Sequence, residues 1–202
     1  MRKVSDRIEF SIVKRPLIKG LLDFECGDDA IVKKFGAKVF LAVIDALGHG
    51  GDAHAISIIC KNFIEKRHNK KLSQTVTALH ENIKSLNKGA VACLAVLDLD
   101  TGELEYVSVG NICLKIFGSV NRKIEYKPGI IGYNIPTPQV EFIKMSMGDV
   151  LVMHTDGVKE HFDITDFPDI MKNSAEKIAK KIIRKFGKEQ DDACCLVLRY
   201  IK

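Results

Sequence analysis

The hydrophobic positions in the N-terminal part of the chain predict β-strands. Residues 30–35 and 39–44 are short, largely apolar runs separated by Gly36, which is the pattern of two strands joined by a turn. Upstream of them, residues 8–22 alternate only in part, as is typical of strands at the edge of a sheet. We therefore expect this part of the chain to be built from strands.

Apolar residues then recur at intervals of three and four, which is the period of an amphipathic helix. Two such stretches follow each other, and Ser73 is the expected N-cap of the second. The expected buried faces carry Ile56, Ile59 and Phe63 in the first helix, and Val76, Leu79, Ile83 and Leu86 in the second.

The second half of the chain returns to strand patterns. Residues 91–99 and 104–109 flank Asp100-Thr101-Gly102, a hairpin turn signal. Further strands are expected at residues 113–117, 123–126, 140–145, 150–153 and 193–200, and a last helix ends near Gly187. Because this order lacks regular β–α alternation, it predicts an α+β protein with antiparallel sheets and helices packed outside them.

The composition is that of one globular domain, which we place at residues 1–202 without a separate sensory domain. Of the 202 residues, 46% are hydrophobic and 28% are charged. No apolar stretch approaches the ~20 residues of a membrane helix, and no signal peptide is evident, so we expect a cytoplasmic protein without membrane contact. The net charge of +5 comes with lysines at helical spacing, which favours solvated helix faces over nucleic-acid binding. The lack of a coiled-coil pattern favours a monomer.

Six cysteines raise the question of disulfides or a thiolate metal site. The sequence has no Cys-x-x-Cys pair, and most of the cysteines lie in apolar runs, so we expect free thiols inside the core. Cys194 and Cys195 are adjacent and would point to opposite faces of a strand. They therefore cannot hold one ion together.

Four aspartates fall at the ends of predicted strands. Asp45 and Asp156 come at or shortly after the end of a strand, whereas Asp28 and Asp191 come just before the start of one. Neighbouring antiparallel strands begin and end at the same edge of a sheet, so these carboxylates can meet at one rim. Without a cation their charges would repel, and an all-oxygen ligand set suits magnesium or manganese rather than zinc.

An aspartate on its own indicates a turn more often than a metal ligand. We interpret Asp98, Asp100 and Asp149 in this way. Residues 45–51 (DALGHGG) add to the case for the other four, because glycines before a helix N-terminus suit a bound phosphate. No Gly-Lys-Ser/Thr follows, so this turn is not a Walker loop.

The motifs around these residues resemble the SpoIIE-type branch of the metal-dependent (PPM) protein serine/threonine phosphatases. Residues 45–50 look like its Asp-Gly-x-Gly-x-Gly motif, and residues 148–160 are close to its GDxLxxxTDGxxE signature. Residues 26–28 (CGD), 106–111 (YVSVGN) and 190–193 (QDDA) are similar to its Ser-Gly-Asp, Asn-Ala-Gly-His and Asp-Asp-x-Thr regions. Within that branch, the short chain is most similar to a stand-alone stressosome phosphatase.

The resemblance implies an αββα sandwich, in which two stacked antiparallel β-sheets are flanked by α-helices. It also implies two divalent cations, manganese or magnesium, whose shared hydroxide attacks the phosphorus of phosphoserine or phosphothreonine. By position, Asp45 would bridge both ions. Asp156 and Asp191 would complete the ligands of the first, and Asp28 and the backbone carbonyl of Ala46 would support the second.

Further residue roles follow from the same resemblance. Asp45, Asp156 and His49 are the expected catalytic residues, and His49 would protonate the leaving oxygen, although a surface-loop histidine is an equal interpretation. Asn111 would orient a water near the ions or simply form a turn, and His154 would be a packed residue or one that supports the metal ligands. The implied partner is a phosphorylated protein, with STAS-domain stressosome proteins as the substrate by analogy.

The chain departs from the family pattern at three points. Ala46 stands where the family has glycine, which would be costly if the backbone there needs a positive φ. Cys194 replaces a threonine, and no arginine clearly matches a phosphate-binding arginine, with Arg15 as the one candidate substitute. Two alternatives therefore stay open: a phosphoprotein-binding module that has lost turnover, and a metal-dependent hydrolase of small phosphate compounds.

Overall fold

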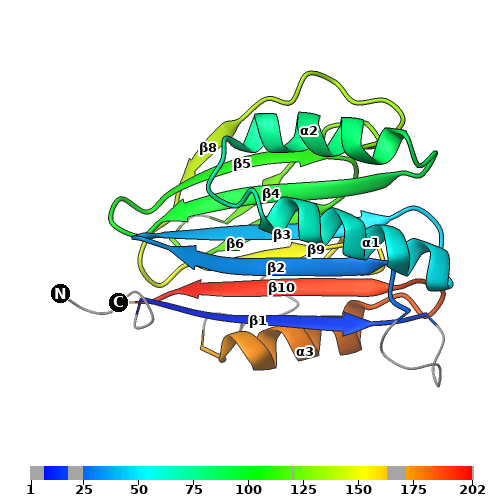
Figure 1. The fold of residues 1–202 in the computed structure, drawn as a ribbon. Coiled ribbons are helices and arrows are strands. Elements are labelled where there is room, and N and C mark those ends of the chain that lie inside the picture. Colours follow the sequence, from blue (N-terminus) through cyan, green and yellow to red (C-terminus); the bar gives the residue numbers. More distant parts are fainter. Residues whose placement is uncertain (1–6, 18–24, 120, 163–171, 202) are drawn as a thin grey trace.

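The computed structural model describes residues 7–17, 25–119, 121–162 and 172–201. Figure 1 shows their arrangement as two layers of strands with helices outside. In chain order, the elements are β1 (Ile8–Arg15), β2 (Asp28–Phe35), β3 (Lys38–Ala46), α1 (Gly50–Glu65), α2 (Leu72–Lys84), β4 (Ala90–Asp98), β5 (Glu103–Val109), β6 (Cys113–Phe117), β7 (Arg122–Ile124), β8 (Glu141–Lys144), β9 (Val150–His154), α3 (Ala175–Phe186) and β10 (Ala193–Tyr200).

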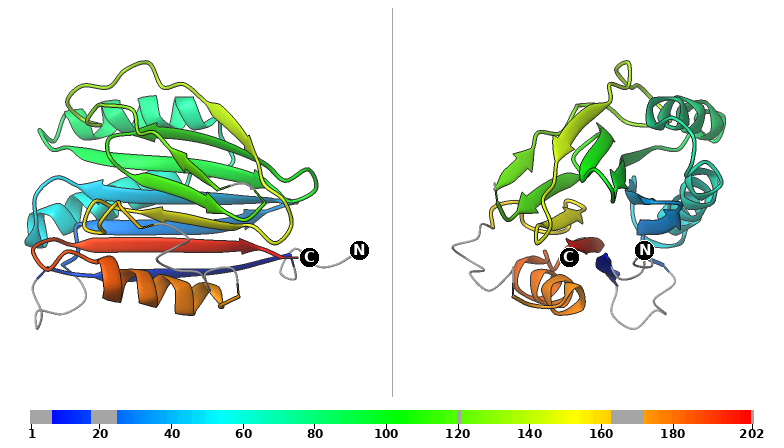
Figure 2. Two further views of the ribbon diagram at one scale, coloured as in Figure 1. Left: turned by 180° about the vertical axis from the view of Figure 1, so that it is seen from behind. Right: turned by 90° about the vertical axis from the view of Figure 1, so that its left-hand side faces the viewer.

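The strands form two five-stranded sheets. One has the order β1-β10-β9-β6-β7 and the other β2-β3-β4-β5-β8, and every pairing between these strands is antiparallel. In Figure 2, α1 and α2 cover the outer face of the second sheet, and α3 covers that of the first. The α+β sandwich with helices on both outer faces is thereby confirmed.

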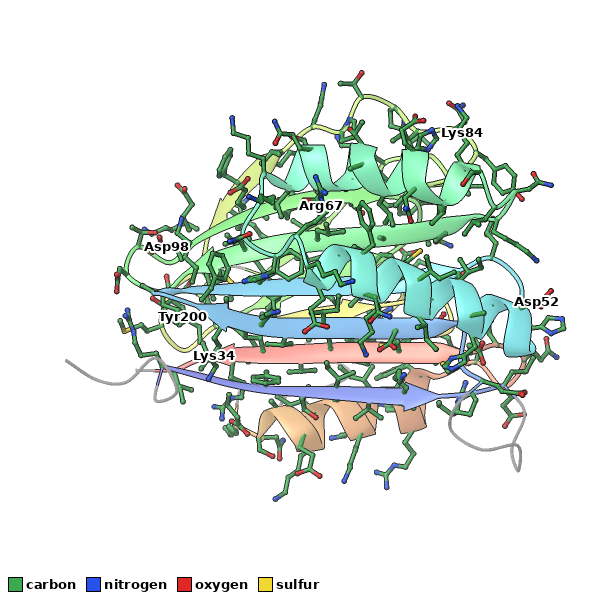
Figure 3. The ribbon with its side chains drawn as sticks, in the orientation of Figure 1. Lys34, Asp52, Arg67, Lys84, Asp98 and Tyr200 are labelled. Carbon is green, nitrogen blue, oxygen red and sulfur yellow. The ribbon has the colours of Figure 1, made fainter. Side chains whose placement is uncertain are left out.

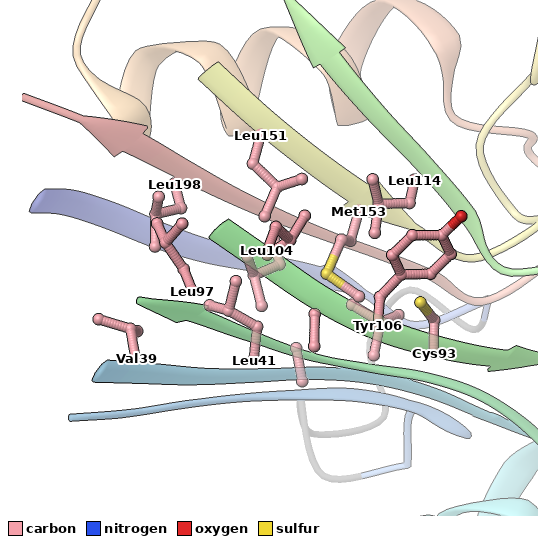
Figure 4. Close-up of a cluster of buried hydrophobic side chains, with 14 of the residues drawn as sticks. Val39, Leu41, Cys93, Leu97, Leu104, Tyr106, Leu114, Leu151, Met153 and Leu198 are labelled. Atoms are coloured by element: carbon pink, nitrogen blue, oxygen red, sulfur yellow. The ribbon is translucent and has the colours of Figure 1, made fainter. Parts of the chain in front are cut away.

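The main core lies between the two sheets. Alternate residues of β3 divide between two environments: Val39, Leu41 and Val43 face the other sheet, whereas Phe40, Ala42 and Ile44 face α1 and α2. Figure 4 shows Leu97 and Leu104 from one sheet against Leu151, Met153 and Leu198 from the other. Because the central strands are covered on both faces, they read in sequence as nearly continuous apolar runs.

The helix faces differ in part from the sequence prediction. Ile59 is 38% exposed, and Leu86 lies beyond the end of α2 and is 44% exposed. The N-cap of α2 is Lys71 rather than Ser73. The buried face of α1 instead uses small residues among the large ones: Ala53, Ile56, Ser57, Cys60 and Ile64. Close packing on β2 and β3 favours small side chains there, and a count of large apolar residues overlooks them.

The thiols are arranged as predicted. All six cysteines are free and buried. Cys194 faces the core between the sheets, whereas Cys195 packs under α3. In the ranges given above, none of the helices combines the length and apolar character needed to cross a membrane.

Several chain ends meet at one end of the sandwich. Asp28 opens β2 directly opposite Asp45 near the end of β3, and His154 closes β9 opposite Cys195 at the start of β10. The N-terminus of α1 lies at this same end. Figure 3 shows Asp52, in the first turn of α1, at the side of the molecule opposite Asp98 and Tyr200. We call it the acidic end, for Asp28, Asp45, Asp156 and Asp191.

Candidate active site

Asp28 and Asp45 come from adjacent strands of one sheet. Asp28 is buried and Asp45 is partly buried. The Thr155 hydroxyl donates a hydrogen bond of 2.6 Å to Asp28 Oδ2, and its oxygen accepts one of 3.0 Å from the backbone N–H of Cys194. Thr155 therefore connects the carboxylate of one sheet to the first strand residues of the other.

Asp156 and Asp191 come from the loops after β9 and before β10, in the other sheet. The side-chain amide of Asn111 donates a hydrogen bond of 2.8 Å to Asp156 Oδ2. Asp45, Asp156 and Asp191 line one cavity of about 400 Å³. Folding thus brings three of the four predicted aspartates into one cavity, with Asp28 paired to Asp45 beside it.

The electrostatic state of these carboxylates reflects crowding. Burial, and then the neighbouring charge of Asp45, raises the pKa of Asp28 well above its usual value. Burial, followed by the charges of Asp156 and Asp191, raises the pKa of Asp45 to about 7. The pKa of Asp191 is also raised, by burial and by Asp156. Keeping all four groups ionised therefore costs free energy unless positive charge is supplied.

A hard divalent cation fits this chemistry. The side chains present only oxygen donors, and magnesium and manganese prefer oxygen ligands. Bound cations would also relieve the mutual repulsion of Asp28 and Asp45. Within the described ranges, however, no group of three or more His, Cys, Asp or Glu side chains is already arranged to hold a metal ion. The ligand set is therefore a proposal, which we develop below.

The glycine-rich turn carries Ala46 without strain. Asn87 is the only non-glycine residue in the described ranges with a positive φ, so the methyl group of Ala46 causes no backbone penalty. Gly48 and Gly50, by contrast, have φ of 99° and 70°, which favour glycine. This result removes one of the two features that favoured an inactive binding module. Cys194 is the other: buried at the start of β10, it contributes its backbone N–H to Thr155.

His49 occupies the N-cap position of α1 in an extended conformation. It is exposed, and its side chain makes no capping hydrogen bond. His154 is buried instead, with Nδ1 at 2.9 Å from the carbonyl oxygen of Thr155, and burial lowers its pKa to about 4. It packs against Phe162, so it is a neutral structural residue as the sequence suggested.

Two supporting residues were missed by the sequence analysis. Thr155 is one, and Asp192 is the other. Asp192 accepts backbone hydrogen bonds of 2.7 Å from Leu17 and 2.8 Å from Gly27, so it holds the chain just before Asp28. The only sequence signal for this role was its place as the second aspartate of residues 191–192.

Arg15 contacts the backbone rather than the cavity. Its guanidinium donates hydrogen bonds to the carbonyl oxygens of Lys188 and Asp191. It therefore supports the loop that carries Asp191. Among the residues that line the acidic cavity in the described ranges, none is an arginine or a lysine.

A second hollow, of about 430 Å³, lies over β6 and β7. Lys115, Arg122, Lys123, Glu160 and Phe162 are among its lining residues. It contains none of the four aspartates, and Glu160 forms an ion pair with Lys123 there. The smaller of these two cavities, at the acidic end, is therefore the candidate active site.

Comparisons with known proteins identify the family and the fold. The profile of the SpoIIE family (Stage II sporulation protein E) matches residues 36–201. No curated protein matches the chain. A solved structure described as "The bacterial stressosome: a modular system that has been adapted to control secondary messenger signaling" is 29% identical with a TM-score of 0.86, covering 95% of this chain and 99% of its own.

Two further structures show the same fold. RsbX in complex with magnesium is 20% identical with a TM-score of 0.79, covering 95% of this chain and 94% of its own. The PP2C phosphatase domain of SpoIIE from Bacillus subtilis is 20% identical with a TM-score of 0.77, covering 96% and 63%. With a family profile that spans most of the chain, the protein belongs to the SpoIIE family and is a PPM-type protein phosphatase similar to RsbX.

Proposed function

We propose that this phosphatase removes phosphate from serine or threonine of a signalling protein, and that its substrate is a phosphorylated STAS-domain component of a stressosome. The stressosome structure that is 29% identical over nearly both whole chains supports this substrate. The observation that carries the phosphatase chemistry is the position of Asp28, Asp45, Asp156 and Asp191 at one end of the sandwich.

We propose further that two divalent cations, magnesium or manganese, are held at the acidic end. Asp45 would contact both, Asp156 and Asp191 would complete the ligands of the first, and Asp28 and the Ala46 carbonyl would support the second. Bound there, the cations would supply positive charge to the phosphoryl oxygens and lower the pKa of coordinated water.

The chain's own residues would orient these ligands and handle the proton. Asn111 fixes one oxygen of Asp156, and Thr155 fixes one oxygen of Asp28, so each carboxylate would present its remaining lone pairs in a defined direction. His49, exposed beside the cavity turn, is the proposed proton donor to the leaving serine oxygen. A single-domain organisation, a monomeric state and a cytoplasmic location stay predictions.

The direct test is phosphate release from a phosphoserine peptide and from a phosphorylated STAS-domain protein. Activity should require added manganese or magnesium and should fall by at least about 100-fold in Asp156→Asn, because a charged group at the proposed reacting centre is removed. Asp100→Asn is the matched control, since Asp100 is exposed and forms an ion pair with Arg7 at the far end. Full activity in excess chelator would refute the proposal.

The same assay separates the alternatives. A small-molecule hydrolase would act on nucleotides or sugar phosphates faster than on the phosphoprotein. A binding module would retain the phosphoprotein without releasing phosphate, with or without metal. Each result differs from the one expected for a protein phosphatase.

A further inference from the structure

The acidic cavity is lined by apolar side chains as well as by aspartates. Besides the three aspartates, its lining includes the side chains of Leu47, Tyr126 and Ile130, which we call the apolar wall. Leu47 is 45% exposed and Tyr126 is 52% exposed, so both side chains are accessible to a ligand in the cavity. At about 400 Å³, the cavity has room for more than a phosphoryl group.

Two residues of the apolar wall, Leu47 and Ile130, pack over one glycine, Gly89. Leu47 donates its backbone N–H to the carbonyl oxygen of Gly89 at 2.9 Å. A Cβ atom at Gly89 would lie 2.6 Å from Leu47 Cδ1, 2.7 Å from Tyr133 Cε2 and 2.8 Å from Ile130 Cγ2. Side chains from two segments that are distant in sequence therefore converge above a position that has no side chain of its own.

The segment that carries Tyr126 and Ile130 is fixed to the sheet. The backbone N–H of Gly110 donates to the carbonyl oxygen of Lys127 at 2.7 Å. Ile131 exchanges two backbone hydrogen bonds with Ala90, of 2.8 and 3.0 Å. The wall is thus preformed, and a ligand would lose little free energy in ordering it.

The charges in the cavity limit what can bind there. Within the described ranges its charged lining residues are Asp45, Asp156 and Asp191, and no basic side chain lines it; Lys188 lines the smaller adjoining hollow, together with Glu160. A phosphoryl group placed at the aspartates, with the proposed cations, leaves the adjacent residue of the same peptide against Leu47, Tyr126 or Ile130. Apolar contact is the interaction that these side chains offer.

We infer that the apolar wall selects phosphorylated segments in which an aliphatic or aromatic residue neighbours the phosphoserine or phosphothreonine. This inference rests on the proposed function and deepens it, because it names the chemistry of the substrate next to the phosphate. Removal of a partly exposed leucine from water against this wall should improve kcat/KM by about tenfold over glycine.

The first experiment uses the wild-type protein with manganese and a set of phosphoserine peptides. The parent has glycine on both sides of phosphoserine, and the others carry leucine or aspartate on the N-terminal or the C-terminal side. At least one leucine peptide should exceed the glycine parent about tenfold in kcat/KM, and aspartate at that side should fall below it. Equal rates for leucine and glycine on both sides would overturn the inference while leaving the phosphatase function intact. Failure to hydrolyse any phosphopeptide or phosphoprotein would refute the proposed function as well.

The second experiment assigns the preference to the wall. In Tyr126→Ser, the preferred leucine peptide should lose most of its advantage through a higher KM, with kcat changed by less than about twofold, because the contact is made in the ground state and transition state alike. Phe142→Ser is the matched control, since Phe142 is 60% exposed on β8 and lies outside the acidic cavity. A leucine preference that survives Tyr126→Ser unchanged, or that Phe142→Ser also removes, would contradict a role for the wall.

Discussion

The two ends of the sandwich use the same residue type in opposite ways. At the end opposite the acidic end, Asp98 accepts backbone hydrogen bonds of 3.0 Å from Asp100 and Thr101, and those bonds lower its pKa. Asp149 accepts backbone hydrogen bonds of 2.9 Å from Ser119 and 2.8 Å from Ser146. These carboxylates stabilise turns, as the sequence analysis expected.

At the acidic end, the aspartates lie close together, and the pKa values of Asp28, Asp45 and Asp191 are raised. Only one oxygen of Asp28 and one of Asp156 is engaged by the side chains of Thr155 and Asn111. Ionised carboxylates therefore stabilise the fold at the end that carries Asp98 and Asp149, and they destabilise it at the acidic end. The comparison teaches that an aspartate's partners, rather than its place at a turn, separate a structural role from a chemical one.

The largest expected difference between the ends is catalytic. Asp45→Asn should lower phosphatase activity by at least about 100-fold, because it removes the central charge of the cluster. Asp98→Ala should leave kcat and KM within about twofold of wild type, since it changes a remote turn. Phosphate release in manganese measures both, and comparable losses in the two variants would break the comparison.

The second difference concerns metal and stability. At a cation concentration about 100 times Kd, binding should stabilise the fold by about 2.7 kcal/mol. For a chain of 202 residues this corresponds to a rise of roughly 5–10 °C in the unfolding temperature. Thermal unfolding in chelator and in manganese or magnesium gives the measurement.

The variant Asp45→Asn separates the effect of charge repulsion from the effect of metal binding. In chelator, the variant should unfold at a higher temperature than wild type, because it lacks one of the repelling charges. Added manganese should raise the unfolding temperature of the variant only slightly, because one of the proposed metal ligands is missing. A variant that is less stable than wild type without metal would show that repulsion at the acidic end is unimportant.

A third prediction concerns the connection between the sheets. Thr155→Val should lower the free energy of unfolding by about 1–3 kcal/mol, because a buried carboxylate and the Cys194 N–H lose their partner. Thr155→Ser keeps the hydroxyl and should recover most of the loss. Urea unfolding of both variants is the measurement, and equal stability of the valine and serine variants would contradict it.

The smallest effect is expected at Asp98. Its folded-state pKa is lowered, so its contribution to stability is present above the ordinary value of 3.8 and is lost as the pH falls through the folded-state pKa. Asp98→Ala should therefore lower stability by about 1 kcal/mol at neutral pH. The difference from wild type should shrink in acid, and a difference that grows there would contradict the assignment.

Much of the fold could be predicted because local signals and burial agree. Asp100-Thr101-Gly102 forms the turn between β4 and β5, and the apolar runs of β3, β4, β9 and β10 are all central strands. The buried face of α1 was harder to predict. Ala53 and Cys60 are buried because their small side chains allow close packing, whereas Ile59 is exposed. Hydrophobicity alone does not report how closely a helix approaches a sheet.

The candidate site, like the fold, could be predicted only in part. Strand ends and motif order led to Asp28, Asp45, Asp156 and Asp191, because antiparallel pairing places those positions at one edge. The supporting contacts could not be predicted: Thr155 reaches Asp28 across 127 residues of sequence, and Asn111 reaches Asp156 across 45. The first pair joins the two sheets, whereas the second depends on the pairing of β6 with β9 in one sheet, and no local pattern encodes either contact.

The buried thiols determine how the folded protein reacts with oxidants. All six are buried, and burial raises the pKa of Cys26, Cys60 and Cys93 to about 12 and that of Cys113 to about 11. They stay protonated, so peroxide and alkylating reagents find no thiolate in the folded protein. Thiol labelling would therefore report unfolding and nothing else, and the proposed aspartate site would work without a contribution from any thiol.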